Sequence, residues 1–302
     1  MAGIAVSRDG AAGTRALFGD IATLPYVAAS SGSLGAMTFI YLTQQPLFAA
    51  GQWLGVEASL IAGVVGVGIL VADSSLPTAA VFAGLNAFPV VRWVRRTLTA
   101  RSDAGGGVDW DPPGLLIGLG LAGIAAVVLV LGGLDGVRAA SHEAPAFDSS
   151  FGGNTTGLAE LLDSVAFVLP GLIAGSWMAM TSTNGILAQG LLAHFGANWR
   201  PDMVALSLPI WILLLLAFAT AATLLGGTAH FIAINVMIVL AVSFCLTGLA
   251  VLHVRARKLA RPLIPLVTLY VLAGLFGWRL LLVALLGVRH SSLGVRPRFT
   301  QS

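Results

Sequence analysis

Three polar side chains lie in long apolar stretches, where their chemistry could serve a ligand. Glu57 is the only acid between residues 21 and 72, and Asn184 and Gln189 lie in an apolar run over residues 164–199. Polar groups among apolar neighbours need hydrogen-bond partners, and an acid in such a place is a functional hypothesis by default. We therefore predict that Glu57, Asn184 and Gln189 face a shared polar cavity and bind a small ligand there.

The same residues also have a structural interpretation, which the sequence leaves open. Glu57 follows Gly55 and can instead lie at a helix break close to water. Asn184 and Gln189 can instead form hydrogen bonds between packed helices. Three glutamines would supply hydrogen-bond partners near Glu57 in either case: Gln44, Gln45 and Gln52.

Small residues recur every four positions through the same apolar run, at Gly171, Gly175, Ala179 and Thr183. In a helix this spacing places them on one face, and a face of small residues lets a second helix approach closely. Pro170, at the start of this ridge, can kink the helix and free a carbonyl group. We predict that Gly171, Gly175 and Ala179 pack against another helix; the alternative is that this face lines a polar cavity.

No pattern in the sequence indicates a catalytic or metal site. Lys258 is the only lysine and lies among arginines, so the sequence contains no phosphate-binding P-loop and the chain is not its own ATPase. Metalloprotease and serine-hydrolase motifs are absent, and no pair of histidines, cysteines or acids has metal-ligand spacing. The single cysteine, Cys245, is expected to be a buried structural thiol. We therefore expect no catalytic residue, no metal and no cofactor.

The elements that must position these residues are predicted to be membrane-spanning helices. The chain is 57% hydrophobic and 10% charged, whereas about 25% of residues are charged in ordinary soluble domains. Residues 203–254 contain no Asp, Glu, Lys or Arg, and this stretch is long enough for two helical crossings of a hydrocarbon core roughly 30 Å thick. The sequence thus predicts an all-α, polytopic transmembrane helix bundle.

Length alone divides the apolar runs into eight predicted spans, at residues 24–42, 46–72, 76–94, 113–134, 161–195, 206–225, 230–254 and 262–288. The second can contain a re-entrant or broken helix near residues 46–57, which makes the total seven to nine. We expect a soluble N-terminal segment over residues 1–23, a single transmembrane domain over 24–288 and a C-terminal tail over 289–302.

The distribution of charge predicts the orientation of the loops. Basic residues crowd residues 92–101 and 255–261, whereas acids dominate residues 135–160. Because basic loops are retained in the cytoplasm, we expect the two basic loops inside and the acidic loop outside. The side of both termini stays open, since it changes with the number of crossings before residue 72.

The composition also points to the setting of the protein. Arginine greatly outnumbers lysine, and alanine, glycine, leucine and valine abound, which is typical of a GC-rich bacterial genome. We therefore expect a multi-pass protein of the bacterial cytoplasmic (inner) membrane. Its partner is the lipid bilayer and not a nucleic acid, because the basic residues form no continuous stripe of the kind that binds phosphate backbones.

Four segments together resemble the YybS-like family, a group of bacterial polytopic membrane proteins of unknown function. They are residues 41–55, 176–189, 248–253 and 276–287, and the resemblance extends over roughly residues 33–298. The tail departs from the family pattern, because His290, Ser292 and Gly294 stand where acidic or aromatic residues are expected. Only Arg296 and Arg298 keep the basic end of the family pattern in this tail.

The glycine-punctuated segment 46–66 is similar, more distantly, to the substrate-binding membrane subunits of energy-coupling-factor vitamin transporters. That resemblance implies a helical bundle that binds a small nutrient, with an ATPase module and other membrane subunits as partners. The lead interpretation is therefore a small-molecule-binding subunit of a transporter. The alternative is a membrane scaffold or envelope-assembly protein, and an intramembrane enzyme is the least favoured class.

Overall fold

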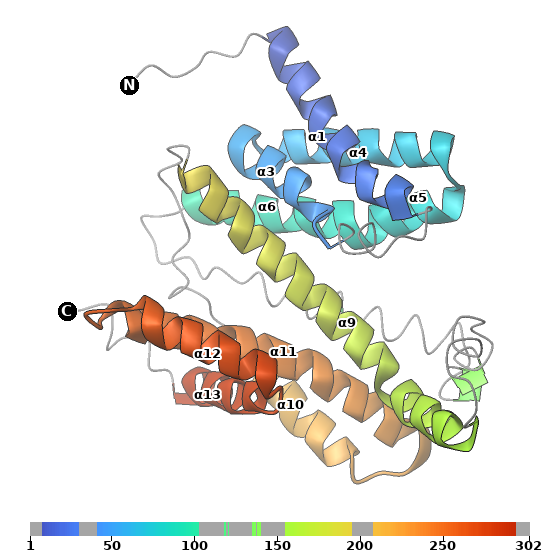
Figure 1. Ribbon diagram of the computed structural model, residues 1–302, viewed down its shortest axis with the longest axis vertical. Helices are drawn as coiled ribbons and strands as arrows, with labels where there is room; N and C mark the ends of the chain where they lie inside the picture. Colours follow the sequence, from blue (N-terminus) through green and yellow to red (C-terminus); the bar gives the residue numbers. More distant parts are fainter. Residues whose placement is uncertain are drawn as a thin grey trace. The chain divides into compact units, whose positions relative to one another are not determined.

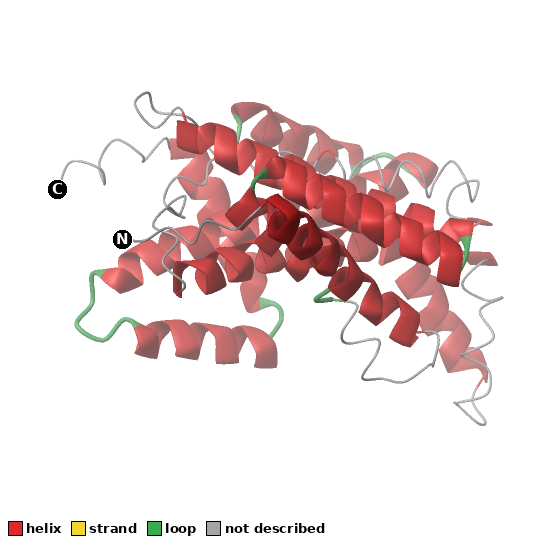
Figure 2. Cartoon of the chain, turned by 90° about the horizontal axis from the view of Figure 1, so that it is seen from above, coloured by secondary structure: helices red, strands yellow, loops and turns green. Residues whose placement is uncertain are grey.

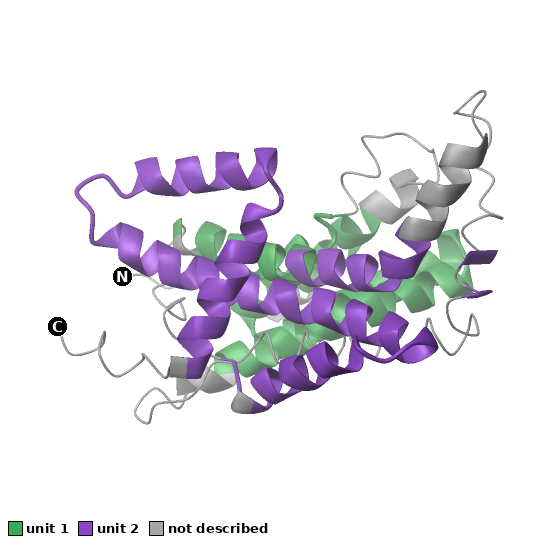
Figure 3. Ribbon diagram, turned by 90° about the horizontal axis from the view of Figure 1, so that it is seen from below, with its two compact units in different colours: residues 1–112, 180–202 green, residues 113–179, 203–302 purple. Residues whose placement is uncertain are grey.

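The computed structural model describes residues 8–29, 41–102, 155–194 and 208–293, together with positions 118, 120, 135–136 and 138–139. The secondary-structure elements of these ranges are all helical, which confirms the all-α class for the described part of the chain (Figure 2). The chain divides into two compact units, and helix α9 (Thr155–His194) contributes to both. Unit 1 comprises Met1–Pro112 and Met180–Asp202, and unit 2 comprises Pro113–Ala179 and Met203–Ser302 (Figure 3).

In unit 1, helix α4 (Val56–Asp73) packs against the helices around it (Figure 1). These are α1 (Arg8–Ala29), α3 (Gln44–Leu54), α5 (Leu76–Phe82) and α6 (Phe88–Ser102), with the π-helical segment η1 (Ala83–Ala87) between the last two. Leu47, Phe48, Leu70 and Phe82 are fully buried and form the apolar interior of the unit.

A helix break separates α3 from α4 at Gly55. This residue has φ 101°, a left-handed conformation that costs little energy only for glycine. The amide of Gly55 still bonds to the carbonyl of Gly51, and the amide of Ala58 bonds to the carbonyl of Gly55, so the chain turns without orphaning these groups. The interruption that the sequence predicts near residues 46–57 therefore falls at this glycine.

A side-chain amide donates a hydrogen bond at a second irregular point of unit 1, where Pro89 interrupts the helical hydrogen bonds. Pro89 lacks an N–H, so it cannot donate to the carbonyl of Leu85 four residues earlier. The Nε2 atom of Gln44 donates to that carbonyl over 3.0 Å. The hydrogen bond comes from a neighbouring helix, as is typical where proline interrupts helices in apolar surroundings.

In unit 2, helix α11 (Gly227–Arg257) packs against three shorter helices, α10 (Ile210–Ala222), α12 (Leu263–Leu275) and α13 (Arg279–Leu293) (Figure 1). The α11–α13 contact is a close backbone approach. A Cβ atom at Gly248 would collide with the carbonyl oxygen of Val283, and one at Gly287 with the carbonyl oxygen of Phe244. Two facing glycines therefore bring the two helices into contact.

The proline kink of α9 lies in unit 2 and is bridged by Asn235 of α11. Pro170 has no N–H for the carbonyl of Ala166, and its ring crowds the helix there, which leaves the next helical pair, the carbonyl of Phe167 and the amide of Gly171, to another partner. The Nδ2 atom of Asn235 donates to Phe167 over 3.0 Å, and its Oδ1 atom accepts from Gly171 over 2.6 Å. One fully buried side-chain amide thus takes the place of a helical hydrogen bond.

Three of the described helices are long and apolar enough to cross a membrane: Val56–Asp73, Val165–Leu192 within α9, and Gly227–Arg257. Helices α10 and α12 are apolar but have 13 residues each. At 1.5 Å per residue, 13 residues extend about 20 Å, which is less than a hydrocarbon core. The sixth predicted span, residues 206–225, is therefore a shorter helix than we expect from its composition.

The eighth predicted span, residues 262–288, is two helices and not one. Helix α12 ends at Leu275, and α13 begins at Arg279 after Phe276, Gly277 and Trp278. Phe276 has φ −133° and ψ 79°, outside the helical region. Gly277 and Arg279 mark this break in the sequence, although apolar residues flank it on both sides.

Two other boundaries differ from the prediction. Helix α6 continues through Ser102, whereas the third predicted span ends at residue 94 and residues 92–101 are predicted to be a basic loop. Helix α1 begins at Arg8 and buries Ala22 and Thr23, so part of the segment 1–23 packs within unit 1. Most of the fourth predicted span, residues 113–134, of the acidic loop 135–160 and of residues 30–40 lies outside the described residues.

Candidate functional site

Glu57 lies in the first turn of α4 and is exposed. The N-terminus of a helix favours a negative charge, because the first amide groups point toward it. The carboxylate of Glu57 is therefore stabilised without a ligand. This agrees with the alternative in which Glu57 lies at a helix break close to water.

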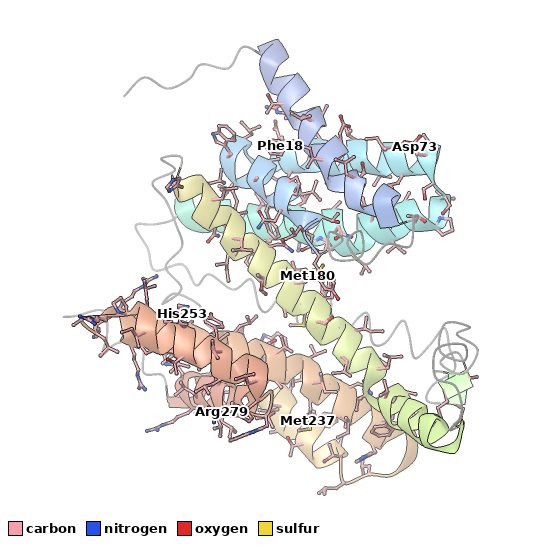
Figure 4. The ribbon with its side chains drawn as sticks, viewed as in Figure 1. Phe18, Asp73, Met180, Met237, His253 and Arg279 are labelled. Atoms are coloured by element: carbon pink, nitrogen blue, oxygen red, sulfur yellow. The ribbon has the colours of Figure 1, made fainter. Side chains whose placement is uncertain are left out.

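Asn184 occupies a different environment, on the part of α9 that belongs to unit 1. It is 2% exposed. Its Nδ2 atom donates to the carbonyl of Tyr41 over 2.6 Å and to the carbonyl of Met180 over 3.0 Å. Met180, labelled in Figure 4, is one turn earlier on the same helix. The amide hydrogens of Asn184 therefore bind main-chain carbonyls and not Glu57.

Helix α3 packs over α9 at Gly185, the residue after Asn184. The Nε2 atom of Gln52 donates to the carbonyl of Gly185 over 3.4 Å. A Cβ at Gly185 would lie 3.1 Å from Trp93 and 3.3 Å from Phe48, and these two rings meet edge to face with centroids 5.7 Å apart. Gly185 thus lets α3 and α6 approach this face of α9.

Several polar side chains of unit 1 have a buried atom for which none of the described residues provides a hydrogen bond. We call them the buried polar cluster: Thr43, Gln44, Gln52, Ser59, Thr181, Ser182, Asn184 and Gln189. All belong to unit 1, and they lie on α3, α4 and α9 or, for Thr43, directly before α3. Ser59 of α4 packs against α3, because a Cβ at Gly51 would lie 2.9 Å from the Cβ of Ser59.

The orientation of three amides in the cluster follows from their partners. Gln44, Gln52 and Asn184 each direct a nitrogen at a main-chain carbonyl. A carbonyl oxygen only accepts hydrogen bonds, so the group that faces it must be the NH₂ end of the amide. The free end of each of these three amides is therefore an acceptor oxygen, whereas the hydroxyls of the cluster can both donate and accept hydrogen bonds.

Gln189 is the third residue of the predicted site. It is half-buried on α9, one turn after Gly185, and its Nε2 atom is buried without a hydrogen bond among the described residues. Asn184 and Gln189 thus both belong to the buried polar cluster, whereas Glu57 is exposed outside it. Their binding of a ligand stays a prediction.

Sequence reasoning did not single out the hydroxyl members of the cluster, Thr43, Ser59, Thr181 and Ser182, as site residues. Serine and threonine commonly bond to the carbonyl one turn earlier in a helix, so their presence in apolar runs is a weak signal. Ser243 and Thr247 of α11 do form such bonds, to Val239 and Ser243. Hydroxyls that bond to a carbonyl of their own helix cannot be told from unpaired hydroxyls by sequence. The tertiary structure is needed to distinguish them.

The glycines of the predicted ridge on α9 face α11 within unit 2. A Cβ at Gly171 would lie 2.9 Å from the backbone carbonyl oxygen of Asn235, and one at Gly175 would lie 3.1 Å from Val242. Ala179 is half-buried, on the next turn of the ridge. The ridge therefore meets a helix where Gly171 and Gly175 lie.

The described residues contain no group of three histidine, cysteine or acidic side chains that could hold a metal ion. No family model matches the chain, and no curated protein or solved structure is significantly similar to it. Inference about function therefore rests on the chemistry of the chain itself.

Proposed function

We propose that this chain is a multi-pass protein of the bacterial cytoplasmic membrane that binds a small polar solute in unit 1. It acts as the substrate-binding subunit of a transporter, with an ATPase module and other membrane subunits as partners. Membership of the YybS-like family and a count of about eight membrane spans are part of what we propose. Its physical support is the apolar composition and the three helices that are long enough to cross a membrane.

The observation that carries the proposal is the buried polar cluster. Leaving one buried polar group without a partner costs about 1–3 kcal/mol. Six members of the cluster are at most 2% exposed: Thr43, Gln44, Ser59, Thr181, Ser182 and Asn184. Oriented oxygens of this kind are better suited to a bound solute than to helix packing alone, which needs only complementary apolar surfaces.

The chemistry of the cluster defines the kind of solute. Its amide oxygens accept hydrogen bonds, and its members carry no charge. A neutral solute with N–H or O–H donors complements these oxygens, whereas a carboxylate would find no positively charged member of the cluster to offset its lost hydration. We therefore expect neutral, donor-rich solutes to bind and acidic ones to be rejected.

A thermal-stability screen of the purified full chain in detergent tests this function. The probes are water-soluble vitamins, nucleobases and matched pairs such as nicotinamide and nicotinate. A bound solute at a hundredfold excess over its Kd stabilises the folded state by about 2.7 kcal/mol. We expect amide or amine probes to raise the unfolding temperature, and their carboxylate counterparts to have no effect.

Two variants on α9 locate the binding. Asn184→Leu removes an oxygen of the cluster and should abolish the stabilisation by the probe while the protein still elutes as a folded species. Thr183→Leu is the matched control, because Thr183 is the adjacent residue and is exposed. A chain that responds to no probe, or an Asn184→Leu variant that responds like wild type, contradicts solute binding at this site.

A membrane scaffold is the second candidate function. The glycine contact between α11 and α13 favours it, because two helices held backbone to backbone form a rigid pair without any polar site. A scaffold shows no response to any probe, whereas its association with partner proteins persists in Asn184→Leu.

A further inference from the structure

The last third of the chain carries charge of one sign only. Asp202 is the final acid, and residues 203–302 contain neither Asp nor Glu. The basic residues of this stretch are Arg255, Arg257, Lys258, Arg261, Arg279, Arg289, Arg296 and Arg298. All charged side chains of this stretch are therefore positive.

Half of these charges gather in one turn of unit 2. Arg255 and Arg257 end the long apolar helix α11, and Lys258 and Arg261 lead into α12. All four side chains are exposed. We call these four residues the basic turn; His253, labelled in Figure 4, lies just before it on α11.

The helix that follows the basic turn has an apolar surface that the described residues leave largely exposed. Helix α12 has no buried residue. Leu263, Val267, Val271 and Leu275 are each more than half exposed. A positively charged turn is therefore continuous with a largely exposed apolar helix.

We propose that the basic turn binds the phosphate group of an anionic phospholipid, whose acyl chains lie along α12. Charge complementarity supplies the headgroup contact, since arginine pairs with phosphate oxygens through two parallel hydrogen bonds. The apolar surface of α12 fits acyl chains and not a soluble anion. Each basic side chain near an anionic lipid surface strengthens attachment about five-fold.

This site is independent of solute binding in unit 1, so either proposal can fail without the other. The orientation that the charges predict also supports it, because anionic lipids of the inner leaflet attract basic segments on the cytoplasmic side.

Titration of the full chain in neutral detergent with dihexanoyl phosphatidylglycerol tests the site, with dihexanoyl phosphatidylcholine as the zwitterionic control. The unfolding temperature gives the apparent affinity. We expect phosphatidylglycerol to stabilise the protein more strongly, and high salt to weaken this preference. Glycerol phosphate, which lacks acyl chains, should stabilise little at the same concentration.

The double variant Arg255→Gln/Arg261→Gln should lose the preference for phosphatidylglycerol by about 25-fold, from two charges at about five-fold each. Arg255→Lys/Arg261→Lys keeps the charge and should retain most of the preference. Arg279→Gln is the matched control, because it removes one charge at the far end of α12, where Arg279 lies over Phe276 and Trp278.

Three results would overturn the proposal. They are equal stabilisation by the two lipids, an unchanged lipid preference in the double glutamine variant, and stabilisation by glycerol phosphate as strong as by the lipid. The last result would indicate a site for soluble phosphate. If the glutamine variant does not fold, the salt dependence of the wild-type chain is the test. A preference for phosphatidylglycerol that high salt does not weaken would contradict the proposal.

Discussion

Two buried asparagines show how differently one residue type can serve this protein. Asn235 uses both ends of its amide: it donates to Phe167 and Phe231 and accepts from Gly171. Asn184 uses only its nitrogen, and its oxygen has no partner among the described residues. The first asparagine therefore satisfies both ends of its amide within the protein, whereas the second satisfies only one, which is why the proposed solute site includes it.

The structural role of Asn235 leads to a stability prediction. Asn235→Leu leaves the amide of Gly171 and the carbonyl of Phe167 unpaired beside Pro170, which should destabilise the protein by about 2–4 kcal/mol. The midpoint of SDS-induced unfolding measures the loss. Ile232→Leu, an apolar exchange at an exposed position of the same helix, should change the midpoint little.

A double-mutant cycle identifies the cause of that loss. Pro170→Ala restores an N–H and lets α9 close its own hydrogen bonds, so Asn235→Leu should cost at most about half as much in that background. An equal cost in both backgrounds would show that Asn235 stabilises the protein by some other contact, and that the kink does not depend on it.

At the scale of helices, the closest packing depends on glycine. Gly248 and Gly287 place α11 and α13 backbone against backbone, and the atoms that a Cβ would meet are main-chain carbonyl oxygens. Main-chain atoms of a helix cannot rotate away as a side chain can. The contact therefore tolerates no added atom unless the two helices separate.

Alanine substitutions at two helical glycines should accordingly have opposite effects on thermal stability. Gly248→Ala should lower it, because overpacking costs typically about 1–3 kcal/mol. Gly68→Ala, in the interior of α4, meets nothing within 4 Å and should raise it by roughly 0.5–1 kcal/mol through helix propensity. If Gly248→Ala raised the thermal stability as Gly68→Ala does, the close contact between α11 and α13 would be contradicted.

At the scale of the whole chain, the orientation in the membrane follows from charge alone. The acidic region 135–160 and the basic turn are predicted to lie on opposite sides of the bilayer. Single cysteines introduced at Ser141 and Leu259, in a Cys245→Ser background, make this measurable. Leu259 suits a probe because it is 54% exposed.

A membrane-impermeant thiol reagent added to intact cells should label the cysteine at position 141 and spare the one at position 259. Inverted membrane vesicles should give the reverse pattern. Labelling of both positions from the same side would contradict the orientation, and with it the side of the membrane on which the basic turn meets lipid.

The sequence by itself determined the helical class and the apolar character of the helices. Charged residues are too costly within a hydrocarbon core to occur by chance, so long uncharged runs are informative without a structure. The positions of Gly55 and Pro170 also mark irregular backbone directly, because their effects on the backbone are local.

Only the tertiary structure decided which polar and small residues act together. Whether an amide is satisfied depends on the carbonyls of a distant helix, as with Gln44 at Leu85 and Asn235 at Phe167. The break of the eighth predicted span at residues 276–278 was also not predicted, because one glycine and one charge, Gly277 and Arg279, do not by themselves show where a helix ends. Hydrophobicity records the solvent that a residue prefers, whereas pairing and packing depend on neighbours that the linear order does not reveal.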